Sequence, residues 1–162
     1  MFGLLQVITV MLVALVAALS VAHALELPGK MRLDEETYRA VQRIYYPGFT
    51  LGGIAEFPAI LATAILVLLT PTGSASFWLV LIALVGMVAM HAIYWIVVHP
   101  VNKYWMEGQS VSAPAVAFFG SNRERRESDW TELRDRWERG HVARAVLTSL
   151  SLLALVTSVV QS

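Results

Sequence analysis

The sequence contains no cysteine, and this absence excludes disulfides, thiolate metal ligands and thiol nucleophiles together. Charge is also scarce, because Asp, Glu, Lys and Arg make up only 15% of the 162 residues and are confined to two blocks. We find no internal repeat, no phosphate-cradling glycine motif and no signal for nucleic-acid binding. What is abundant is apolar: 57% of the residues are hydrophobic, which favours a membrane protein.

Four apolar runs are long enough to cross a bilayer, for which about 20 residues are needed. They comprise approximately residues 2–25, 49–69, 77–98 and 142–160. We therefore predict an all-α fold: an integral, multi-pass membrane protein that forms a four-transmembrane-helix bundle as one domain over residues 1–162.

The first apolar run ends in Ala22-His23-Ala24, which looks like a signal-peptide cleavage site. Signal peptides, however, begin with a positive segment and have a short apolar region. No Lys or Arg precedes Lys30, and this run is about twice the usual length. We expect it to be retained as a transmembrane helix.

The basic residues predict the orientation, since Lys and Arg are retained on the cytoplasmic side. Four of them, Lys30, Arg32, Arg39 and Arg43, lie between spans one and two, and those from Lys103 to Arg139 lie between spans three and four. We expect both long connections in the cytoplasm, with the N- and C-termini outside.

The first connection is predicted to start where Leu27-Pro28-Gly29 ends the first helix. Asp34 is a suitable N-cap for a short helix through about Tyr45. This helix could lie along the membrane surface or be an ordinary amphipathic connector. Its apolar face would consist of Leu33, Tyr38, Val41, Ile44 and Tyr45.

The second connection is predicted to begin with Pro100-Val101-Asn102 and to continue through a Gly/Ser/Ala/Pro stretch to Gly120. Ser128-Asp129 then caps a helix, with Glu132 in capping-box position. Apolar residues at helical spacing predict that this helix runs directly into span four as its cytoplasmic extension. They are Trp130, Leu133, Trp137 and, as the last member of the face, His141.

All four histidines lie in or at the edges of apolar segments. Since alternate helices run in opposite directions, the sequence predicts a shallow layer of polar residues at one face of the bundle: His23, Glu26, His99, Asn102, His141 and Arg144. At about 1.5 Å per residue, Glu56 and His91 should share a second, deeper layer.

Imidazoles and carboxylates that project from several helices into a bundle centre can bind metals. The candidate metal ligands are His23, Glu26, Glu56, His91, His99 and His141, and Asn102 and Arg144 would orient them or stabilise an oxyanion. The ligand types suit a redox metal, iron or copper, with zinc or haem as alternatives.

Simpler explanations exist for these residues. His23, His99 and His141 lie near enough to the interface to bond water or backbone. Glu56 and His91 lie well inside the spans, where an ionisable group is costly and functional by default, although the two could pair as a purely structural contact.

Several features together resemble a family of small membrane proteins that includes the anthrone oxygenases of polyketide pathways. They are four short spans, Pro100-Val101-Asn102 after the third, and the segment from Trp137 through His141 to Arg144 that opens the fourth. The resemblance implies a four-helix membrane bundle and, for some members, oxidation of a phenolic polycyclic substrate by molecular oxygen. The positions that match are His23, Asn102, His141 and Arg144, whereas the segment 25–30 and the helix after it depart from the pattern.

Two functional hypotheses follow. The first is a metal-binding oxidoreductase or oxygenase that acts on a lipid-soluble small molecule. The second is a non-enzymatic accessory subunit, or a small binding or transport module of a larger membrane complex, since apolar outer faces suit lipid and a partner helix equally. The lipid bilayer is the expected partner in both, nucleic acid in neither, and self-association into a homo-oligomer is compatible with both.

Overall fold

The computed structural model describes residues 1–45, 47–105 and 129–161, and these residues form helices without any strand. The helices are α1 (Phe2–Lys30), α2 (Glu35–Gln42), the 3-10 turn η1 (Arg43–Tyr45), α3 (Gly48–Ile54), α4 (Glu56–Leu69), α5 (Ala75–Ile93), the π-helical turn η2 (Tyr94–Val98), α6 (His99–Trp105) and α8 (Trp130–Val160).

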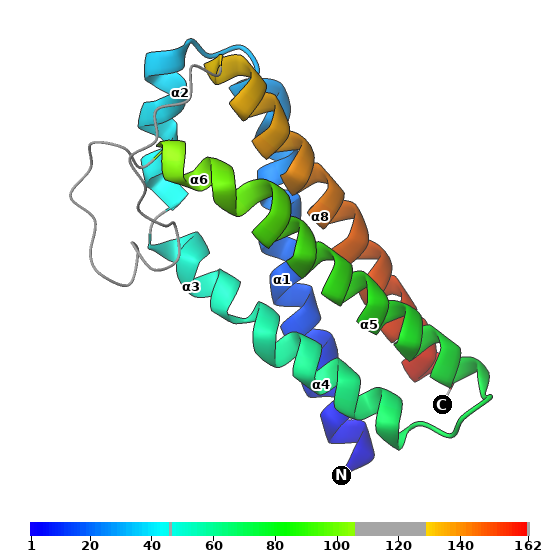
Figure 1. The fold of residues 1–162 in the computed structure, drawn as a ribbon. Helices are drawn as coiled ribbons and strands as arrows, with labels where there is room; N and C mark the ends of the chain where they lie inside the picture. Colours follow the sequence, from blue (N-terminus) through cyan, green and yellow to red (C-terminus); the bar gives the residue numbers. More distant parts are fainter. Residues whose placement is uncertain (46, 106–128, 162) are drawn as a thin grey trace.

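Four helical segments are long and apolar enough to cross a membrane: Phe2–Lys30, Gly48–Leu69, Ala75–Asn102 and Trp130–Val160. Helix α8 packs against α1 and α5, and α4 packs against the same two helices, so that neighbours in the ring are antiparallel (Figure 1). The predicted all-α, four-helix membrane bundle is confirmed. Both termini lie at one end of the bundle, and α2 and α6 lie at the other; which end faces the cytoplasm stays a prediction.

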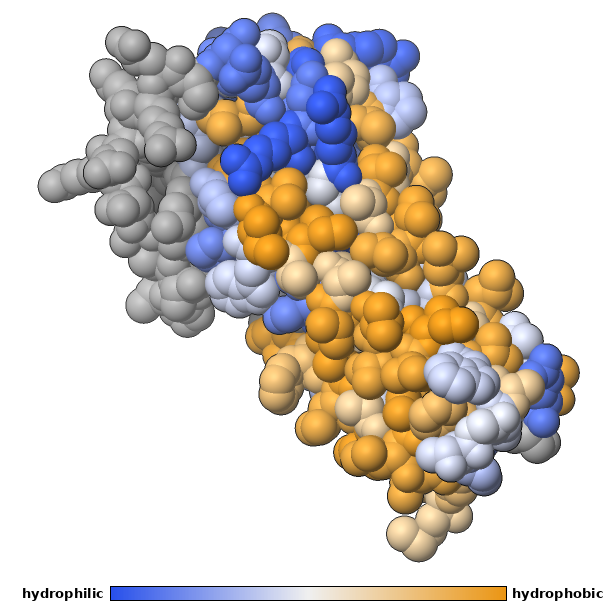
Figure 2. All heavy atoms as spheres, turned by 45° about the vertical axis from the view of Figure 1, so that its right-hand side comes forward, coloured by the Kyte–Doolittle hydropathy of each residue, from blue (hydrophilic) through white to orange (hydrophobic). Residues whose placement is uncertain are grey.

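The face seen in Figure 2 is apolar over most of the length of the bundle, and polar residues gather at the end that carries α2. Large apolar side chains such as Leu61, Val85 and Leu153 are more than half exposed on the outer surface of the bundle. Lipid is as apolar as these side chains, so their exposure is what a membrane-spanning bundle requires.

Small and hydroxylated residues bring the helices close together inside the bundle. Gly86 of α5 lies directly against Ser151 of α8, and Gly52 of α3 lies against Leu19 of α1. The buried hydroxyl groups of Thr9, Thr63 and Thr148 donate to carbonyls four residues earlier in their own helices, at 2.7 to 2.9 Å. No buried hydroxyl among these three is left unbonded in the apolar interior.

The first connection differs from prediction at its start. Leu27-Pro28-Gly29 does not end α1, which continues to Lys30. Pro28 removes only its own N–H, and α1 ends two residues later, so the loss of a single hydrogen bond is tolerated. Because α1 continues, Lys30 is drawn into the bundle, where it is 3% exposed.

Pro100 does not begin the second connection, and this prediction was also wrong. The third span continues through Pro100 to Trp105 as α6. Proline cannot donate to the Ile96 carbonyl four residues earlier, but the Nη2 group of Arg136 donates to that oxygen at 3.0 Å. The π-helical turn η2 lies directly before the proline, where such turns relieve a disturbed hydrogen-bond pattern.

Both predicted N-caps are present. The carboxylate of Asp34 accepts from the Thr37 N–H at 2.8 Å, and that of Asp129 accepts from the Thr131 N–H at 3.0 Å. Helix α8 runs without interruption into span four, as predicted. The predicted apolar face of the short helix is wrong at Ile44, which is 67% exposed, because the chain tightens into the 3-10 turn η1 at Arg43; Tyr38 and Tyr45 are buried. Ser128 and the stretch to Gly120 lie outside the described residues.

Candidate functional site

Two imidazoles, His23 of α1 and His141 of α8, meet at the polar end of the bundle. Their ring centroids are 4.1 Å apart at an interplanar angle of 36°, and the residues are 6% and 4% exposed. Tyr45 and Phe49 pack on His23 at 4.5 and 4.4 Å, and Trp137 packs on His141 at 4.1 Å. We call His23 and His141 the imidazole pair.

The imidazole pair is unusual in its hydrogen bonding. Nδ1 of His23 and both ring nitrogens of His141 are buried and have no hydrogen-bond partner among the described residues. A buried polar group without a partner costs about 1 to 3 kcal/mol, and such groups concentrate where a protein binds ligand or performs chemistry. The pair is therefore the first candidate for a functional site.

A buried lysine lies beside the pair. The Nζ atom of Lys30 is 3.1 Å from Glu26 Oε2 and 3.5 Å from Glu138 Oε1, so one cation lies between two carboxylates. The same ammonium group lies 4.8 Å from the ring centroid of Tyr45 and 4.9 Å from that of Trp137. We call Lys30, Glu26 and Glu138 the lysine cluster, and it shares two aromatic walls with the imidazole pair.

Two tyrosines join the lysine cluster to the first connection. The hydroxyl of Tyr38 donates to Glu138 Oε1 at 2.8 Å, and that of Tyr45 donates to Glu26. Burial raises the pKa of both hydroxyl groups above the usual value of 10, and the neighbouring carboxylates raise each pKa further. Both tyrosines therefore stay protonated and act as hydrogen-bond donors at neutral pH.

Glu56 lies at the centre of a second group. Its Oε2 atom is 2.9 Å from His91 Nδ1, and its Oε1 atom binds the Nη2 group of Arg144. The Trp95 indole donates to the other His91 nitrogen at 3.0 Å, and the Arg144 guanidinium lies over the Tyr94 ring at 5.1 Å. Pairing of Glu56 with His91 is what their common depth predicted. Arg144 was assigned to the shallow layer, but its long side chain reaches Glu56.

Asn102 and His99 are placed differently from each other. Asn102 is 5% exposed, and its Oδ1 atom accepts from the Trp137 indole at 2.7 Å. It therefore fixes the ring that packs on the imidazole pair. His99 packs on the rings of Trp95 and Tyr94, at centroid distances of 4.8 and 5.8 Å.

The predicted metal ligands do not converge on one point. Within residues 1–45, 47–105 and 129–161, no group of three or more His, Asp or Glu side chains is placed to hold a metal ion. His23 lies with His141, Glu56 with His91, and Glu26 with Lys30. A metal site with three protein ligands does not fit this part of the chain.

Sequence reasoning missed Lys30, Glu138 and the two tyrosines as parts of the site. One signal was available: Glu138 comes three residues before His141 and therefore shares its side of α8. Another was that Lys30 follows Glu26 by four residues, the spacing of a helical ion pair. The prediction that Pro28 ends the helix obscured the second signal.

Comparisons with known proteins agree with this architecture. A family model described as anthrone oxygenase matches residues 42–154, from the end of α2 to Ala154 in α8. The match includes His91, Asn102, His141 and Arg144, whereas His23 of α1 precedes it. No curated protein and no solved structure matches the chain.

Proposed function

The chain belongs to the anthrone oxygenase family, and on this premise we propose that it oxidises a lipid-soluble phenolic polycyclic compound with molecular oxygen at the imidazole pair. One observation carries the proposal: two buried imidazoles lie ring to ring, and three of their four nitrogens have no hydrogen-bond partner among the described residues. Such nitrogens are available to a substrate.

The imidazole pair would act as the base. An anthrone has a methylene group conjugated through two aromatic rings to a carbonyl. When one methylene C–H bond breaks, the proton passes to an imidazole nitrogen and the electron pair moves to the carbonyl oxygen. The resulting anion forms a C–O bond with O₂, and the peroxide oxygen takes the proton back from the imidazolium. Loss of one water from the hydroperoxide leaves a second carbonyl. One atom of O₂ stays in the product and the other leaves as water.

Arg144 would stabilise the oxyanion. It follows His141 by three residues on α8, and its Nε atom is buried without a hydrogen-bond partner among the described residues. Its Nη2 group is held by Glu56, so the guanidinium is fixed before substrate binds. A fixed donor in an apolar site stabilises developing negative charge without reorganisation.

The chemistry proposed for the imidazole pair requires no metal. The redox-metal prediction stays a prediction, with the imidazole pair as the place where two nitrogen ligands meet. Elemental analysis of the purified protein tests it separately.

Oxidation of 1,8-dihydroxyanthrone by the purified protein in lipid nanodiscs tests the proposal. Oxygen uptake and formation of the quinone are followed together, with empty nanodiscs as the blank. His23→Gln and His141→Gln each keep a polar side chain of similar size but remove the base, and we expect each to lower kcat by about 10² or more. The matched control is His99→Gln, since His99 packs on Trp95 and Tyr94.

Wild-type turnover that equals the blank, or equal rates in His141→Gln and His99→Gln, would contradict the proposal. If the wild-type protein contains stoichiometric metal and both His23→Gln and His141→Gln lose it, the two histidines are metal ligands and do not act as a base. Loss of activity confined to the two variants of the imidazole pair, in metal-free protein, would support the base.

A further inference from the structure

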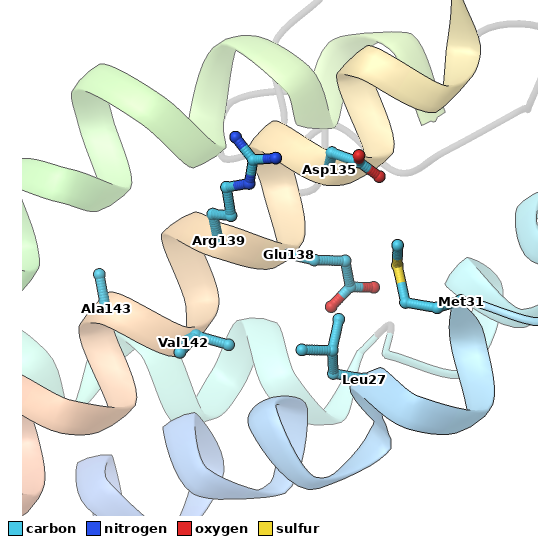
Figure 3. Close-up of a pocket in the computed structure, with 7 residues that line it drawn as sticks. All are labelled: Leu27, Met31, Asp135, Glu138, Arg139, Val142 and Ala143. Carbon is cyan, nitrogen blue, oxygen red and sulfur yellow. The ribbon is translucent and has the colours of Figure 1, made fainter.

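The C-terminal end of α1 and the N-terminal part of α8 line a pocket of about 410 Å³ (Figure 3). This volume lies within the range of about 300 to 1,000 Å³ that small-molecule sites occupy. Its walls are mainly apolar, with one buried carboxylate and two polar side chains. The lining residues are Leu27, Met31, Asp135, Glu138, Arg139, Val142 and Ala143.

Glu138 gives the pocket a specific hydrogen-bond acceptor. The residue is 2% exposed, and its carboxyl group lies between Leu27 and Met31 (Figure 3). Its Oε1 atom accepts from Tyr38 and faces Lys30, whereas its Oε2 atom has no hydrogen-bond partner among the described residues. A buried carboxylate oxygen without a donor is a place for a ligand donor.

The charges around the pocket favour a neutral donor. Lys30 already lies 3.5 Å from Glu138 Oε1, and Arg139 lines the same pocket. A cationic ligand would meet both of these positive groups. A hydroxyl group on an apolar body, by contrast, can donate to Oε2 and place the rest of the molecule against Leu27 and Val142.

Two residues that line the pocket lie close in sequence to the imidazole pair. Leu27 follows His23 by four residues, about 6 Å along α1, and Val142 directly follows His141 on α8. The pocket therefore lies about one helical turn from His23 along α1 and one residue from His141 along α8. We propose that this pocket binds the phenolic hydroxyl of the substrate, with Glu138 Oε2 as the acceptor. This inference rests on the function proposed above and assigns its substrate-binding residue.

Binding of 2-hydroxyanthraquinone tests the inference. This probe has three rings and a hydroxyl that is too far from its own carbonyls to bond them. 2-Methoxyanthraquinone has the same rings but no donor. We expect titration calorimetry in nanodiscs, corrected with empty nanodiscs, to show that the methoxy compound binds about tenfold more weakly, as the loss of a hydrogen bond to a charged group requires.

Two substitutions on α8 separate binding from folding. Val142→Trp fills the pocket beside Glu138 without removing a charge, and Val146→Trp makes the same change one turn away, on a residue that is 53% exposed. We expect Val142→Trp to weaken binding of the hydroxy compound about tenfold or more and Val146→Trp to leave it unchanged. Glu138→Gln should bring the affinities for the two compounds together.

Equal affinity of wild-type protein for the two compounds, or equal binding by the two tryptophan variants, would overturn the inference. Displacement of the probe by dioleoylglycerol at one tenth of the probe's concentration would also overturn the inference, because the pocket would then bind the hydroxyl group of a lipid. The probe has no methylene group to oxidise, so its binding is independent of turnover. If the probe binds but the protein does not oxidise 1,8-dihydroxyanthrone, only the proposed function is contradicted. If Val142→Trp leaves the KM for 1,8-dihydroxyanthrone unchanged, only this inference is contradicted.

Discussion

Replacing Glu56 with leucine should strongly destabilise the protein. Glu56 is 6% exposed and Arg144 also 6%, so the substitution leaves a buried guanidinium without its carboxylate. Breaking a buried ion pair by removing one partner costs about 3 to 5 kcal/mol. For a domain of this size, 1 kcal/mol shifts the melting temperature by about 2 to 4 °C, so we expect a decrease of about 6 to 20 °C.

The double variant Glu56→Leu/Arg144→Met provides the critical comparison. It removes both charges, and such replacements of a buried pair are often close to neutral. His91→Leu is the matched control, because it removes only the partner that is 35% exposed and should cost less than Glu56→Leu. Melting is followed by circular dichroism in one detergent. If Glu56→Leu loses less than about 1 kcal/mol, or the double variant is as unstable as the single one, the pair does not stabilise the bundle as argued.

Three further predictions concern the polar end of the bundle. Because burial raises the pKa of Tyr38 and Tyr45, their contribution to the free energy of unfolding is complete below pH 10 and is lost as the pH rises above 10. The free energy of unfolding should therefore be lower at pH 11 than at pH 8, and this decrease should be smaller in Tyr45→Phe. Asn102→Leu leaves the Trp137 indole unbonded and should cost about 1 to 3 kcal/mol, with a shifted tryptophan emission. In Gly140→Ala the new Cβ would lie 2.8 Å from Val98 Cγ2, so the melting temperature should fall, and Val98→Ala should restore part of it.

These outcomes would each be contradicted by a specific result. If wild type and Tyr45→Phe lose the same free energy of unfolding between pH 8 and pH 11, ionisation of Tyr45 does not cause the loss. Unchanged tryptophan emission in Asn102→Leu would mean that Trp137 does not depend on the amide. An unaltered melting temperature in Gly140→Ala would mean that α8 and η2 are not in close contact.

The sequence predicted those features that follow from the physical constraints of the bilayer. Apolar run length predicted the four spans, and the cost of ionisable groups at equal depth predicted that Glu56 and His91 would meet. Helix ends were less predictable, since Pro28 and Pro100 look like stops but lie near ends where one lost N–H is tolerated. The pairing of Lys30 with Glu138 depends on how α1 is rotated against α8, which periodicity within either helix does not specify.

The position of α8 in the chain has a consequence for biosynthesis. It is the last of the four spans to be made, and it supplies Arg144 to Glu56 and Glu138 to Lys30. Until α8 enters the membrane, α1 and α4 carry a cation and a carboxylate that lack these partners. The partners that α8 brings to Lys30 and Glu56 are therefore in place only after this last span has been inserted.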